Sequence, residues 1–96
     1  MHSAEIEPDL LKILQKISKK DKVLYEQILK KIDEIRQSFD VDHYKNLRSP
    51  LNEFKRVHVK NSFVLIFKYI ATDKKVIFYY FDHHDYVYQW QLNSKE

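Results

Sequence analysis

The chain has 96 residues, of which 44% are hydrophobic and 32% charged, and its formal charge is +3. This length favours one domain over residues 1–96 with a modest core, and the composition excludes an intrinsically disordered chain. The sequence has no cysteine, which excludes disulfides and thiolate metal sites, and no glycine, which excludes glycine-rich phosphate-binding loops.

The first half of the chain is predicted to be helical, after a short edge strand near residues 4–6. Pro8 suits the first turn of a helix, and Asp21 suits the N-cap of a second helix after a break in the pattern at residues 18–21. The two apolar stripes have helical spacing and consist of Leu10, Leu11, Ile13, Leu14 and Ile17, then Val23, Leu24, Ile28, Ile32, Ile35 and Phe39. The short turn between them predicts an antiparallel helical hairpin.

The second half is predicted to be a sheet. A polar connector at residues 40–52 leads to an alternating strand at 54–59 and to two strands, 63–70 and 76–81, that are apolar on both faces. The short links between them favour antiparallel neighbours, and another short strand or helix is expected at residues 86–92. The predicted fold class is α+β, with an N-terminal helical hairpin packed on an antiparallel sheet of three to four strands.

None of the apolar stretches approaches the roughly 20 residues that a membrane-spanning helix needs. The first residues also lack a basic segment followed by an apolar run, so we expect no secretory signal and a cytoplasmic protein without membrane contact. The mildly basic balance, with a pI of about 9.0, permits nucleic-acid binding, although a solvated lysine-rich surface would account for it equally.

The first candidate functional segment is RVHVK at residues 56–60. Strand alternation places Arg56 and His58 on one face, together with Lys60 if the strand extends that far. A cationic strand face can hold phosphates, because each contact replaces a condensed counterion. The alternative is a solvated sheet face with long basic side chains.

The second candidate is DHHD at residues 82–85, directly after a predicted inner strand. Strand ends present reactive groups on a rigid scaffold, and histidine can transfer a proton near neutral pH. We expect no metal site, because adjacent side chains on a strand point apart, which would keep His83 and His84 from sharing an ion, and no spaced ligand pattern is present. A structural histidine that caps the strand end is the other alternative.

The third candidate is the aromatic segment at residues 86–90. If it is extended, Tyr86, Tyr88 and Trp90 share one face and could stack on unpaired bases. Packing against the helices is the alternative.

Four runs in this order resemble the RelE/ParE superfamily of toxins, and its RelE-like branch most. They are LRSPL at 47–51, FKRVHV at 54–59, SFVLIF at 62–67 and DHHDYVY at 82–88. With the helical hairpin before them, the resemblance covers nearly the whole chain. It implies an antiparallel sheet with two helices on one side, and a toxin of a type II toxin–antitoxin system. RelE-like members cut mRNA in the ribosomal A site without a metal, whereas ParE-like members poison DNA gyrase without acting as enzymes.

The resemblance also implies site residues. The catalytic candidates are Arg56, His58, His84 and Tyr88. Val64 stands where the family has a strand arginine, and a cation from elsewhere would have to replace it. The RNA-binding candidates are Lys45, Arg48, Lys60, His83 and Trp90.

The implied partners are a RelB-like antitoxin and mRNA on the ribosome, with no metal and no small-molecule cofactor. Two alternatives remain open at this level. One is a gyrase inhibitor of the ParE type, and the other is a degenerate toxin that retains only antitoxin or RNA binding.

Overall fold

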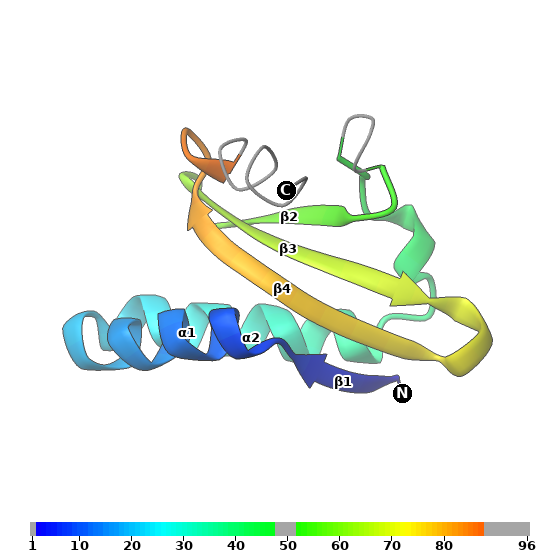
Figure 1. Ribbon diagram of the computed structural model, residues 1–96, viewed down its shortest axis with the longest axis horizontal. Helices are drawn as coiled ribbons and strands as arrows, with labels where there is room; N and C mark the ends of the chain where they lie inside the picture. The colour runs from blue at the N-terminus through cyan, green and yellow to red at the C-terminus, as the bar shows by residue number, and fades with distance from the viewer. Residues whose placement is uncertain (1, 48–51, 88–96) are drawn as a thin grey trace.

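The computed structural model describes residues 2–47 and 52–87. Helices α1 and α2 lie on one side of a four-stranded sheet (Figure 1). The elements follow in the order β1 (Ser3–Ile6), α1 (Pro8–Lys20), α2 (Lys22–Gln37), a 3-10 helix η1 (Val41–His43), β2 (Lys55–Val59), β3 (Phe63–Ile70), a 3-10 helix η2 (Ala71–Asp73) and β4 (Lys75–His83). The predicted α+β class is confirmed, whereas most of the element predicted at 86–92 lies outside the described residues.

The helical hairpin forms as predicted. Pro8 occupies the first turn of α1, and the Asp21 side chain caps α2 by accepting a hydrogen bond from the Leu24 N–H at 3.1 Å. Three residues of the predicted apolar stripes are exposed instead of buried. Leu11 and Val23 are exposed on their helices, and Phe39 is fully exposed because α2 ends at Gln37. Within residues 2–47 and 52–87, no helix has the length and apolar character needed to cross a membrane.

The sheet has the strand order β1-β4-β3-β2. The pairs β2–β3 and β3–β4 are antiparallel, as predicted. The edge strand predicted near residues 4–6 is also present, but it pairs with β4 in parallel, so the sheet is mixed. All four β1 residues are exposed, and their pairing rests on backbone hydrogen bonds, which leave no side-chain pattern from which the direction could be predicted.

A β-bulge interrupts the pairing of β3 with β4. Ile66 pairs with Tyr80, whereas the next residue, Phe67, pairs with Phe78, so Tyr79 is the extra residue. Consequently Tyr79 and Tyr80 both pack on the side of the sheet away from the helices. We call this side the distal face.

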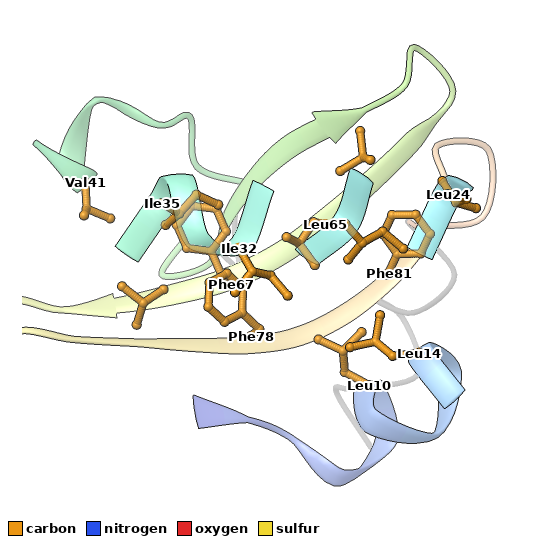
Figure 2. Close-up of a cluster of buried hydrophobic side chains, with 13 residues drawn as sticks. Leu10, Leu14, Leu24, Ile32, Ile35, Val41, Leu65, Phe67, Phe78 and Phe81 are labelled. Carbon is orange, nitrogen blue, oxygen red and sulfur yellow. The ribbon is translucent and has the colours of Figure 1, made fainter. Parts of the chain in front are cut away.

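The main core lies between the helices and the sheet (Figure 2). Leu10 from α1, Ile28 from α2, and Phe67 and Phe78 from the inner strands are fully buried there. A smaller cluster on the distal face consists of Leu47, Phe54, Val64, Ile66 and Val87. Strand β3 contributes to both clusters, which explains why its sequence is apolar on both faces.

A buried lysine joins the connector to the sheet. Lys55 at the start of β2 is only 6% exposed, and its Nζ donates to the carbonyls of Asp42 and Tyr44 at 3.3 and 3.1 Å and to the Asn46 Oδ1 at 3.1 Å. The ammonium is therefore desolvated but well bonded, and it fixes residues 42–46 beside β2.

Candidate functional site

A shallow pocket of about 180 Å³ lies on the distal face. Strand alternation directs Arg56 and His58 from β2 toward it, and His58 pairs in register with Val64 of β3. Its described lining consists of Arg56, His58, Val64, His84 and Val87. Val64 and Val87 form the floor of the pocket. Around it lie the predicted side chains Arg56 and His58 from β2 and His84 from the turn after β4.

The turn after β4 fixes the His84 imidazole. Strand β4 ends at His83, the His84 backbone N–H donates to the Ser62 carbonyl at 2.8 Å, and the His84 Nδ1 lies 3.1 Å from the same oxygen. Because a carbonyl can only accept, Nδ1 carries the ring proton in the neutral form. The other ring nitrogen, Nε2, lies 3.1 Å from the Asp85 Oδ1. Since His84 bonds to the end of the β2–β3 turn, it also has the capping role considered as an alternative.

His83, the last residue of β4, does not line the pocket. Its ring meets Phe63 edge to face at 5.7 Å and stacks on His84 at 4.7 Å. The His83 Nδ1 accepts the Asp85 backbone N–H at 3.2 Å and lies 3.4 Å from the Asp85 Oδ2. The Asp85 carboxylate therefore faces both histidines, with one oxygen near each.

Two other RNA-binding candidates lie outside the pocket lining. Lys45 is exposed on the connector, and its carbonyl accepts the Arg56 backbone N–H at 2.9 Å. Lys60 occupies the β2–β3 turn with a positive φ of 54°, so it does not continue the alternation of Arg56 and His58. The candidates Arg48, Tyr88 and Trp90 lie outside the described residues.

A polar pair on the distal face, Tyr80 with Asp82, was not predicted from the sequence. The Tyr80 hydroxyl donates to the Asp82 Oδ2 at 2.7 Å, and the Asp82 Oδ1 accepts the His83 backbone N–H at 2.7 Å. Burial, followed by the hydrogen bond to Asp82 and its negative charge, raises the pKa of Tyr80 to about 12. Asp82 pairs in register with Val64, and counting back two residues along β4 from Asp82 would have found Tyr80.

No family model matches the sequence. A protein of Methanocaldococcus jannaschii named "Putative toxin RelE4" is 56% identical over 89 residues, which cover 93% of each chain. The isolated Escherichia coli RelE toxin has a TM-score of 0.69 at 17% identity over 100% of both chains. RelE in the intact RelBE toxin–antitoxin complex gives 0.68 at 17% identity, over 86% of this chain and 96% of that one. The chain belongs to the RelE-like branch of the RelE/ParE toxin superfamily.

Proposed function

We propose that the protein is a metal-independent, ribosome-dependent mRNA endonuclease that inhibits translation. The observation that carries this proposal is the pocket on the distal face, where one guanidinium and two imidazoles surround a valine floor. A guanidinium suits the bidentate binding of a phosphate, and imidazoles are the side chains best suited to proton transfer near neutral pH.

The reaction would be attack of an RNA 2′-oxygen on the adjacent phosphorus. The new P–O2′ bond forms while the P–O5′ bond breaks, a base takes the proton of the 2′-hydroxyl, and an acid gives one to the departing 5′-oxygen. Arg56 would bind the phosphate, and His58 and His84 would transfer the protons. In His84 the nitrogen available for this is Nε2, because Nδ1 donates to Ser62. By resemblance, Tyr88 would orient the RNA or transfer a proton.

The protein would act as the toxin of a type II toxin–antitoxin system in the cytoplasm, where ribosomes are found. E. coli RelE has been solved in complex with the antitoxin RelB, and this chain shares its fold. We extend the same kind of partner, a RelB-like antitoxin, to this protein. Lys45, Arg48, Lys60, His83 and Trp90 would contact RNA around the reacting phosphate.

A purified translation system provides the test. Primer extension on the mRNA should show cuts that require ribosomes and persist in a chelator selective for transition metals, which leaves the Mg²⁺ of the ribosome in place. Cleavage should fall by about 100-fold or more in Arg56→Gln, His58→Gln and His84→Ala, since a positioned acid or base supplies about 10²- to 10⁴-fold and an electrostatic contact to the reacting phosphate about 10²- to 10³-fold. His43→Gln is the matched control, because His43 is an exposed histidine away from the pocket. Equal cleavage by the wild type and His84→Ala would refute the assignment of His84.

One observation favours a second candidate, a toxin-like protein that binds without cleaving. Val64 is 3% exposed in the pocket floor, where the family has an arginine, and its register partner on β4 is the acidic Asp82. Loss of DNA supercoiling without RNA cleavage would indicate a ParE-type gyrase inhibitor. Expression that is harmless without an antitoxin would indicate a protein that retains only antitoxin or RNA binding.

A further inference from the structure

The DHHD segment brings several electron-pair donors together. One ligand atom from each of His83, His84 and Asp85 lies within 4.8 Å of the other two. The side chains of His83 and His84 do not point apart as neighbours within a strand would, because β4 ends at His83 and His84 begins a turn. Instead the two rings stack at 26° to one another.

The hydrogen bonds show which ring nitrogens face the Asp85 carboxylate. The His84 Nδ1 donates to Ser62, so in the neutral ring Nε2 directs a lone pair toward the Asp85 Oδ1 at 3.1 Å. The His83 Nδ1 accepts the Asp85 backbone N–H, so it too carries a lone pair, 3.4 Å from the Asp85 Oδ2. Two ring nitrogens therefore face one carboxylate, an arrangement that a positive charge stabilises, whether a proton on the His84 ring or a cation bound between the three side chains supplies it.

A transition-metal cation fits this arrangement. Ligand atoms about 2.1 Å from a tetrahedral Zn²⁺ ion lie about 3.4 Å apart. The Asp85 Oδ1 lies 3.1 Å from the His84 Nε2 and the Asp85 Oδ2 lies 3.4 Å from the His83 Nδ1, so the carboxylate would bind the ion with both oxygens. Metal-bound histidines usually donate their other ring N–H to a carbonyl or carboxylate, as His84 does to Ser62. A cation at the His83 Nδ1 would replace its 3.2 Å hydrogen bond, and solvent could complete the coordination, because the Asp85 side chain is 65% exposed.

We propose that His83, His84 and Asp85 form a binding site for a first-row divalent cation of the Zn²⁺ class, and that the bound cation inhibits the protein by withdrawing His84 from the distal pocket. The first part stands on the geometry of the turn alone. The inhibitory part rests on the proposed function, because it assumes that the His84 Nε2 acts on RNA. The cation would not take part in the chemistry.

Binding is tested on untagged full-length protein with the metal alone. Zn²⁺ titration by calorimetry should show one saturable site, and Co²⁺ should give the visible absorption bands of a tetrahedral N/O site. We expect His84→Gln and Asp85→Asn each to weaken Zn²⁺ binding about 10-fold or more, with unchanged circular dichroism because both side chains are exposed. His43→Gln should bind as the wild type does. No saturable binding, or binding that both variants retain, would overturn the site and leave a protonated histidine–aspartate pair in its place.

The inhibitory part is tested in the translation assay, with metal-buffered Zn²⁺ compared with a chelator selective for transition metals that leaves Mg²⁺ in solution. Wild type and His43→Gln should lose cleavage as Zn²⁺ saturates, whereas Asp85→Asn should keep cutting at the same Zn²⁺ level. Zn²⁺ binding without RNA cleavage under any condition would overturn the proposed function but support the metal site. RNA cleavage that saturating Zn²⁺ does not slow would overturn the inhibitory role alone.

Discussion

Among single residues, Lys55 is a charged side chain in a buried position of the described part of the fold. Its buried ammonium is the donor for two carbonyls and one amide oxygen. Strand alternation places Lys55 on the same side as Val57 and Val59, so the direction of its side chain could be predicted from the sequence. The oxygens that accept its hydrogen bonds could not be predicted, because they belong to an irregular connector.

We therefore expect Lys55→Met to lower the free energy of unfolding by about 1–3 kcal/mol, because it removes the three hydrogen bonds that the buried ammonium donates. Lys68→Met is the control. Lys68 pairs with Glu53 at 3.5 Å in a more exposed position, where an ion pair contributes about 1 kcal/mol or less. Urea unfolding of both variants measures the difference, and equal losses would contradict a special role for Lys55.

Tyr80 permits a prediction about pH. Its pKa, raised from 10.0 to about 12, exceeds that of the unfolded chain. The resulting stabilisation is therefore complete below pH 10 and is lost as the pH rises toward 12. In an ultraviolet titration of tyrosinate, Asp82→Asn should lower the highest tyrosine pKa toward 10, and Tyr80→Phe should remove that transition. An unchanged final transition in Asp82→Asn would show that Asp82 does not raise this pKa.

At the scale of elements, the chain makes its strand connections without glycine. The β3–β4 connection ends at Lys74, whose φ of 49° and ψ of 50° are left-handed, and the β2–β3 turn contains Lys60 with a positive φ. An L-residue with a side chain is disfavoured in this region. Both turns therefore contain modest backbone strain that the pairing of the flanking strands compensates.

We expect Lys74→Gly to raise the free energy of unfolding by about 0.5–1 kcal/mol, since glycine adopts this conformation without a steric penalty. Thr72→Gly, in the same connection but within η2, should destabilise the protein by a similar amount, because there glycine only adds freedom to the unfolded chain. Chemical denaturation of the two variants distinguishes these effects. Destabilisation by both substitutions would show that the lysine side chain contributes more than its backbone conformation costs.

At the scale of the whole molecule, the sequence specifies well what depends on local pattern. Both helices were predicted correctly from the apolar stripes and from Pro8 and Asp21, and both inner strands from their apolar sequences. The parallel direction of β1 depends instead on how distant segments meet, and Phe39 is exposed because the helix ends two residues before it, at Gln37. The site divides in the same way: alternation places Arg56 and His58 together, whereas the approach of His84 depends on the Ser62 carbonyl, which is 22 residues away in the sequence.

The bulge at Tyr79 has a consequence for comparison among relatives. Before it, even-numbered residues of β4 such as Phe78 face the helices; after it, odd-numbered residues such as Phe81 do so. A relative that lacks the extra residue would show a one-position gap at this point, and positions aligned beyond a misplaced gap would compare side chains from opposite faces. Functional residues in 80–85 should therefore be equated by the face that they occupy, with the bulge as the reference point, and not by their distance along the chain.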